Sequence, residues 1–213
     1  MTDPTTLAAA LPPLAAWTAH TLWLARRLRI ARTDPLTALP TRDPFTSRAL
    51  RAVTRRPVSV LLLDIDRFKH VNDAFGHAAG DALLAAVGQR LHHWCTEHNG
   101  FAGRLGGDEF AAIADLDDAG AAEALNDLTH RLRANLDIAD AVRISPRVSI
   151  GICRPDDRPG EPFTARLRAA DEAMYAAKSL STGWRYAAPH PTHATVGGRR
   201  AGRRGTHTAL ASR

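Results

Sequence analysis

An apolar segment that ends in paired carboxylates constrains the fold of this chain more than any other feature. Residues 58–63 are apolar except for Ser59, and Asp64-Ile65-Asp66 follow at once. This short run predicts a buried strand ending at Asp64. Two segments of helical period come next, with apolar residues at Phe68, Val71 and Phe75 and then at Leu84, Val87 and Leu91. A strand followed by two helices is typical of an α/β or α+β sheet domain.

Two glycines between apolar runs predict a tight β-hairpin further along the chain. The runs are 101–105 and 110–114, and Gly106-Gly107 between them supply the positive φ that such a turn needs. Downstream, we expect a helix over 116–136, a strand at 148–152, a helix over 163–177 and a short last strand near 184–186. The predicted fold class is therefore α+β, an antiparallel or mixed five-stranded sheet flanked by helices, in the order β-α-α-β-β-α-β-α-β.

The chain divides by composition into residues 1–33, a globular domain at 34–186 and a tail at 187–213. Residues 5–25 carry no fixed charge, and Arg26, Arg27, Arg29 and Arg32 follow. Two interpretations stay open. The run is just long enough to span a membrane, with the arginines on the cytoplasmic side, or a helix over about 14–31 serves as a stalk or dimer contact.

Net charge argues against a nucleic-acid partner for the globular part. The chain has a net charge of +6, but the tail alone holds five arginines and no acidic residue. Without these five, 23 basic residues face 22 acidic ones, so we expect no nucleic-acid binding by the domain. The tail is rich in Pro, His, Thr, Gly and Arg, which predicts disorder. Cys95 and Cys153 show no paired spacing, which favours a reducing, cytoplasmic setting.

Two groups of carboxylates are candidates for a metal site. Asp64 and Asp66 stand at the end of a buried strand, where an unpaired carboxylate is very costly. Asp108 and Glu109 stand at the hairpin tip beside glycines that allow close approach. If the two strands are neighbours, the groups meet at one sheet edge. Carboxylate oxygens together with substrate phosphates are what Mg²⁺ prefers, whereas Asp108-Glu109 alone would be read as a polar turn.

The order of the motifs resembles the GGDEF family of diguanylate cyclases. The resemblance covers about residues 33–186 and rests on five ordered motifs: Asp34-Pro35-Leu36-Thr37; the run from Asp64 to Asp73 with Gly76-His77 and Gly80-Asp81; Arg104-Leu105-Gly106-Gly107-Asp108-Glu109-Phe110; Ser149-Ile150-Gly151-Ile152; and the run from Ala170 to Lys178. It implies a ferredoxin-like nucleotidyl cyclase core in which two GTP molecules are condensed into cyclic di-GMP, with loss of pyrophosphate, across a homodimer.

The resemblance also implies roles for individual residues. Asp64, Asp108 and the Ile65 carbonyl would hold Mg²⁺ or Mn²⁺, and Asp108, Glu109 and Lys69 would form the catalytic group. The residues implied in substrate binding are Asn72 and Asp81 at the guanine base, Lys178 at the phosphates, and Phe68, Gly106, Gly107 and Arg185 around them. A carboxylate that accepts from the N1 and N2 hydrogens of guanine is chemically suited to this base.

Three departures from the family pattern qualify the implied function. Ala38 stands where glycine is usual in the first turn, for which we expect a small effect. Glu97 and Gly100 stand at the Arg-x-x-Asp product-inhibition positions, so feedback through that site should be absent. The phosphate-binding arginine is displaced to Arg185, which either reaches the phosphate or leaves it held less tightly. The main alternative is therefore a catalytically inactive GGDEF domain that binds GTP or a protein partner.

Overall fold

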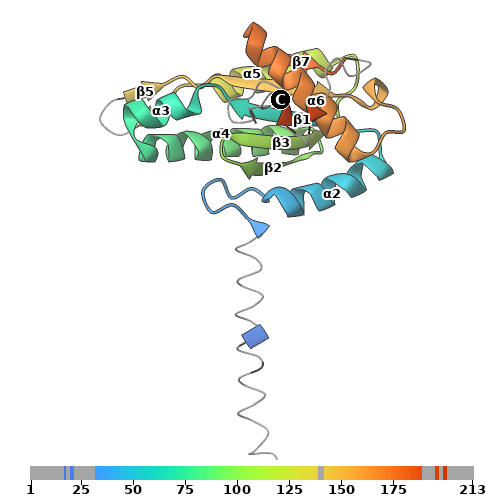
Figure 1. Ribbon diagram of the computed structural model, residues 1–213, viewed down its shortest axis with the longest axis horizontal. Helices are drawn as coiled ribbons and strands as arrows, with labels where there is room; N and C mark the ends of the chain where they lie inside the picture. Colours follow the sequence, from blue (N-terminus) through green and yellow to red (C-terminus); the bar gives the residue numbers. More distant parts are fainter. Residues whose placement is uncertain are drawn as a thin grey trace, which may run out of the picture.

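The computed structural model describes residues 32–138 and 142–188, together with Trp17, His20, Thr21 and the pairs 195–196 and 199–200. Its centre is a mixed five-stranded sheet in the order β2-β3-β1-β6-β7 (Figure 1). The strands are β1 (Ser59–Ile65), β2 (Phe101–Gly106), β3 (Glu109–Ala114), β6 (Val148–Cys153) and β7 (Trp184–Tyr186). All neighbours are antiparallel except β6 and β7, which run parallel. The predicted fold class is confirmed.

Helices cover both faces of the sheet, because alternate residues of the central strands are apolar on both sides. The helices are α2 (Arg42–Arg55), α3 (Phe68–Phe75), α4 (His77–Glu97), α5 (Ala121–Arg133) and α6 (Phe163–Leu180). Leu61, Leu63 and Ile65 pack in one core cluster with α4 and α5. Val60 and Leu62 pack in the other with residues of α2 and α6. Figure 1 shows α6 crossing the sheet and α2 lying along β2.

Close contact between α6 and β6 depends on one glycine. A Cβ atom built on Gly151 would lie 1.9 Å from the Ala170 carbonyl oxygen and 2.2 Å from the Met174 nitrogen. Both are backbone atoms that cannot move aside cheaply, so only glycine fits. The close approach seats α6 directly on the sheet and fixes the direction in which its C-terminal turn points.

The structure differs from the sequence prediction in several elements. Helix α2 was not predicted, because it is rich in polar and charged residues and only Phe45 and Ala49 are buried in it. The helix predicted over 116–136 is α5, which begins after a turn in which the Asp117 carboxylate accepts from the Gly120 N–H at 2.7 Å. Leu136 instead begins β4 (Leu136–Ile138), which pairs with β5 (Val142–Ile144). Strand β1 continues one residue beyond Asp64.

Minor elements and the chain ends complete the described structure. A short 3-10 helix, η2 (Pro155–Asp157), follows β6, and β8 (Thr195–Val196) pairs with β9 (Arg199–Arg200) within the predicted tail. Among the described residues, no helix has the length and apolar character needed to cross a membrane. The segment 5–25, for which two interpretations were open, lies almost wholly outside those residues.

Candidate active site

The two carboxylate groups meet at one edge of the sheet. Strand β1 pairs with β3 in the register that sets Asp64 opposite Glu109. The Ile65 N–H donates to the Asp108 carbonyl at 3.3 Å, which fastens the hairpin tip to the end of β1. The sequence predicted that the two groups meet if their strands are neighbours, and β1 and β3 are neighbours in the sheet.

Asp64 is the buried carboxylate of this group, at 3% exposure. The Lys178 ammonium, from the last turn of α6, donates to its Oδ1. Burial raises the pKa of Asp64, Lys178 opposes the rise, and the nearby Asp108 and Glu109 charges add to it. Asp64 therefore sits where a positive charge is needed, and Lys178 supplies it. Neighbouring Asp66 accepts from the Ser149 hydroxyl at 2.8 Å.

The hairpin tip combines open space with fixed backbone. Gly106 and Gly107 have φ of 136° and 57°, and a Cβ atom at either position would meet nothing within 4 Å. The tip therefore offers room for a ligand beside Asp108. Glu109 lies 3.8 Å from Arg42 of α2, which partly offsets its charge.

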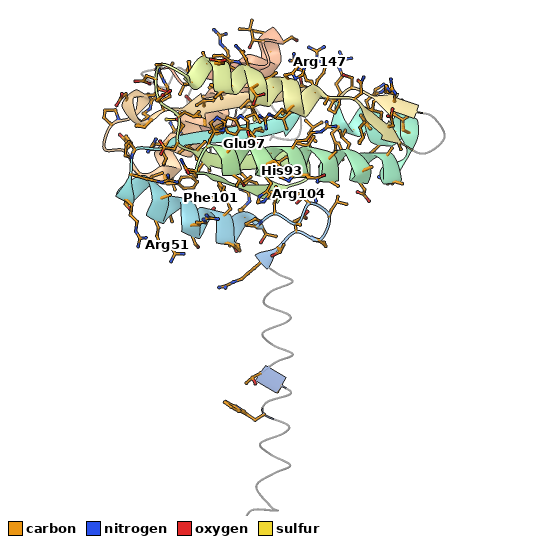
Figure 2. The ribbon with its side chains drawn as sticks, turned by 180° about the vertical axis from the view of Figure 1, so that it is seen from behind. Arg51, His93, Glu97, Phe101, Arg104 and Arg147 are labelled. Atoms are coloured by element: carbon orange, nitrogen blue, oxygen red, sulfur yellow. The ribbon has the colours of Figure 1, made fainter. Side chains whose placement is uncertain are left out.

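An arginine ties the hairpin to the first turn of the domain. Arg104 donates through Nε and Nη2 to the Gly107 carbonyl, at 3.0 and 2.8 Å. Its Nη1 lies 2.9 Å from an Asp34 carboxylate oxygen, and Asp34 also accepts from the N–H and hydroxyl of Thr37, at 2.8 and 2.7 Å. Figure 2 shows Arg104 between the hairpin and this turn. The sequence placed Asp34 and Arg104 in family motifs but predicted no role for either residue.

The turn itself holds Ala38 at φ 58°, the left-handed conformation that glycine adopts more easily. The substitution noted in the sequence therefore falls on a position that does need positive φ, as expected. Leu39 beyond it is buried against α4, so packing on both sides of the turn holds the strained residue in place.

The corner between α3 and α4 brings the predicted guanine-binding residues together. Arg67, at φ 57°, turns the chain from β1 into α3. The Asn72 side chain lies over Gly80: a Cβ atom there would be 1.9 Å from the Asn72 Oδ1 and 3.2 Å from Phe68. Asp81, the next residue, is exposed. Gly80 thus provides the space in which the half-buried Asn72 amide lies beside the Asp81 position.

Two of the predicted site residues, Lys69 and Arg185, are exposed. Lys69 is exposed in the first turn of α3, three residues after Asp66. Arg185 is exposed on edge strand β7, where it pairs with Gly151 of β6, and Gly151 pairs with Leu62 rather than Asp64. The structure therefore does not bring Arg185 to the carboxylate group.

The position of the family's product-inhibition motif carries a compensated charge network. Glu97 ends α4 and pairs with Arg131 of α5 at 2.8 Å, and Arg131 also pairs with Asp127 at 2.8 Å. Sequence reasoning noted Glu97 but missed Arg131, because the spacing between α4 and α5 is set only by the fold. Figure 2 shows Glu97 at the end of α4, on the side that faces α5.

The residues present fit a divalent cation that is completed by substrate. Among the described residues no group of three or more His, Cys, Asp or Glu side chains is preformed. Two carboxylates and a carbonyl are a sparse set, but Mg²⁺ is commonly bound by one or two carboxylates plus substrate phosphates. The Lys178 ammonium on Asp64 shows that this buried carboxylate accepts a cation.

Comparison with known proteins agrees with this geometry. A sequence profile described as "Diguanylate cyclase, GGDEF domain" matches residues 31–183. The chain is 49% identical over 181 residues to an uncharacterized 19.3 kDa protein in the repSA 5′ region of Streptomyces ambofaciens, covering 84% of this chain and 95% of that protein. It is 38% identical over 164 residues to diguanylate cyclase TpbB of Pseudomonas aeruginosa, covering 73% of this chain but only 37% of TpbB.

A solved structure shares the fold over most of the chain. The coiled coil and GGDEF domain of DgcB from Caulobacter crescentus, in complex with c-di-GMP, superposes with a TM-score of 0.73 at 27% identity. The match covers 86% of this chain and 99% of that one. Because the profile and the relatives both span the carboxylate edge, the hairpin and the α3–α4 corner, the chain belongs to the GGDEF family of diguanylate cyclases.

Proposed function

We propose that this chain is an active diguanylate cyclase, which binds one GTP per protomer with Mg²⁺ or Mn²⁺ and joins two GTP molecules into cyclic di-GMP. The observation that carries the proposal is the buried Asp64 beside the open Gly106-Gly107 tip, with a cation already paired to it. Family membership alone would fit an inactive domain as well. The retained carboxylates favour activity.

In the proposed complex, Asp64, Asp108 and the Ile65 carbonyl hold the cation. A divalent metal at this position lowers the pKa of the attacking 3′-hydroxyl and offsets charge on the α-phosphate. The chain's own residues position the nucleotide. The Gly106-Gly107 backbone borders the phosphates, Lys69 and Lys178 neutralise them, and Asn72 and Asp81 read the guanine edge.

Lys178 has two roles in this proposal. In the structure it neutralises Asp64, and with a divalent cation bound to Asp64 the ammonium would be available to a substrate phosphate. The side chain is 41% exposed, so it can move without disturbing the core.

One protomer supplies groups for one GTP, so the reaction requires two copies related by a two-fold axis. We infer a homodimer whose sites face each other. Regulation through the segment before Asp34 is compatible with this arrangement, because Asp34 and Arg104 connect that segment to the hairpin tip.

The decisive test is incubation of the purified protein with GTP and Mg²⁺, followed by separation of the nucleotides. We expect cyclic di-GMP and pyrophosphate. Asp64→Asn and Asp108→Asn should each lower the rate by about 100-fold or more, as loss of a charge-stabilising group does, while the circular dichroism spectrum stays unchanged. Near-normal turnover in either variant at ordinary Mg²⁺ concentration would refute the metal assignment.

A second candidate, an inactive domain that binds GTP, is favoured by one observation: Arg185 lies away from the carboxylates. The two functions separate in the same assay. GTP binding without product would select the inactive domain, whereas product formed by the Arg185→Ala variant at the wild-type rate would show that this arginine is dispensable.

A further inference from the structure

An open cavity lies at the end of the sheet away from the carboxylates. Its volume is about 760 Å³, and it is lined by the end of α2, the residues around η2 and the start of α6. Figure 1 shows these segments on one side of the molecule, opposite α3. The volume is within the range of small-molecule sites, about 300–1,000 Å³. The charged residues of its lining are Arg55, Arg56, Arg158, Arg166, Asp156 and Glu161.

Arg166 is the unusual member of this lining. It is only 4% exposed, and its Nη2 donates to the Val58 carbonyl. Its Nε is buried and has no hydrogen-bond acceptor. Within the part of the chain that the structure describes, no carboxylate forms an ion pair with Arg166. A buried charge without a partner costs several kcal/mol, by general estimates, so the guanidinium lies where a negative charge is missing.

The group closest to Arg166 does not supply that charge: the Cys153 thiol interacts with the guanidinium, but burial raises the pKa of this thiol. Arg158 donates to the carbonyls of Asp157 and Ala188, both at 2.7 Å. Helix α6 begins beside the cavity with no acidic residue in its first turn and no side-chain cap, and the acidic residue nearest in sequence to this positive end is Glu161, just before the helix. The segment that continues from Ala188 adds no side-chain carboxylate, because residues 187–213 contain none.

We propose that this cavity, here called the Arg166 cavity, binds a small phosphate-bearing anion. The Arg166 guanidinium would be its main contact, with Arg55 and Arg158 at the rim and the first N–H groups of α6 beside it. Planar guanidinium groups pair with phosphate through two parallel hydrogen bonds. Asp156 and Glu161 at the rim disfavour a polyanion that would cover the whole opening, so the ligand is a compact one. The site is separate from the carboxylate edge and does not depend on cyclase activity.

Binding of inorganic phosphate and pyrophosphate, measured by calorimetry without divalent metal and at constant ionic strength, tests the proposal. Arg166→Met should weaken binding at least tenfold. Arg168→Met is the matched control, since Arg168 is an exposed arginine on the same helix that pairs with Glu172 and does not line the cavity; it should bind as the parent does. Lys178→Met controls for anions held at the carboxylate edge and should also bind normally.

Three outcomes would overturn the proposal. These are no saturable binding to the parent protein, equal binding to Arg166→Met, or binding lost in Lys178→Met and kept in Arg166→Met. Arg166→Met should fold, because an apolar side chain in place of an unpaired buried charge is often neutral or stabilising. If it does not fold, Arg166→Lys decides: it keeps the charge but lacks the planar fork. Several-fold weaker binding by Arg166→Lys supports the site, and unchanged affinity refutes it.

Discussion

Asp64 shows how one buried carboxylate links stability to function. Its pKa is raised above the ordinary value of 3.8, mainly by burial. A carboxyl group with a raised folded-state pKa favours the folded state below its unfolded pKa, and this contribution is lost as pH rises through the folded-state pKa. The proposed metal site therefore holds a carboxylate that costs stability at neutral pH, and Lys178 limits that cost.

Replacing Lys178 with methionine should expose this cost. We expect the pKa of Asp64 to rise further and the free energy of unfolding near pH 7 to fall by about 1 kcal/mol, the low end for an unsatisfied buried charge, because Lys178 is half exposed and solvent screens the pair. Urea unfolding between pH 4 and 8, without divalent metal, measures this change in the free energy of unfolding. The double variant Asp64→Asn/Lys178→Met should lose the added pH dependence; if it keeps that dependence, another group is responsible.

The pKa of Asp34 is shifted in the opposite direction to that of Asp64. Burial raises its pKa, but hydrogen bonds from Thr37 and the Arg104 guanidinium outweigh burial, so the net pKa lies below 3.8. Its stabilising contribution is present above the unfolded pKa and is lost as pH falls through the lowered folded-state pKa. Asp34→Asn should reduce the free energy of unfolding at pH 7 by about 1.5–3 kcal/mol, as for hydrogen bonds to charged groups.

That difference between Asp34→Asn and the parent should shrink as the pH drops below about 4, near the ordinary pKa of an aspartate. Unfolding curves of both proteins at pH 3 and pH 7 provide the measurement. A gap of the same size at the two pH values would mean that the charge of Asp34 is not the cause of the lost stability.

Between helices, the α3–α4 corner places Gly80 against Asn72, a residue of the proposed guanine site. Gly80→Ala places a methyl group on the Asn72 side chain. The obstructing atom is the end of a short side chain, which can rotate away, and alanine is a better helix former than glycine. We therefore expect stability to be unchanged or slightly higher, while GTP binding weakens by about tenfold, equivalent to about one hydrogen bond.

A double-variant cycle makes this prediction specific. If Gly80→Ala acts by displacing Asn72, it should have no further effect on GTP affinity in the Asn72→Ala background, because both variants remove the same interaction. Additive losses would show instead that Gly80 contacts the nucleotide directly. Gly76, with φ of 83° and open space around it, is unsuitable as a control, since any side chain there is strained.

For the molecule as a whole, the network at the end of α4 bears on regulation. Glu97 and Asp127 both pair with Arg131, so its charge is already balanced and Gly100 offers no side chain. A dinucleotide phosphate would meet Glu97 as a like charge. We expect cyclic di-GMP at micromolar concentration not to inhibit through this surface, and product to accumulate linearly until GTP is limiting.

Initial rates with and without added cyclic di-GMP check this expectation, with Glu97→Gln as the companion variant. Inhibition that appears only in Glu97→Gln would show that Arg131 is an anion site masked by Glu97. Strong inhibition of the parent protein that is not competitive with GTP would contradict the prediction and point to another surface.

The amino-acid sequence by itself determined the order of the main helices and strands along the chain and the position of the hairpin. Apolar runs and glycine pairs act locally, so strand β1, the Gly106-Gly107 turn and the last helix follow from residues that are neighbours in the chain. The motif residues of the family could be named for the same reason. Helix α2 and the β4–β5 pair were not predicted, because their apolar residues are few and partly buried by distant elements.

Only the tertiary structure decided which side chains meet. Lys178 and Asp64 are 114 residues apart in sequence and become partners because Gly151 lets α6 lie on the sheet. Arg104 reaches Asp34 across 70 residues, and Arg185 is kept from the carboxylates by the register of β7. The burial of Arg166 without a carboxylate partner among the described residues could not be predicted from its neighbours in the chain either. Burial and pairing are properties of distant contacts, which local sequence patterns do not encode.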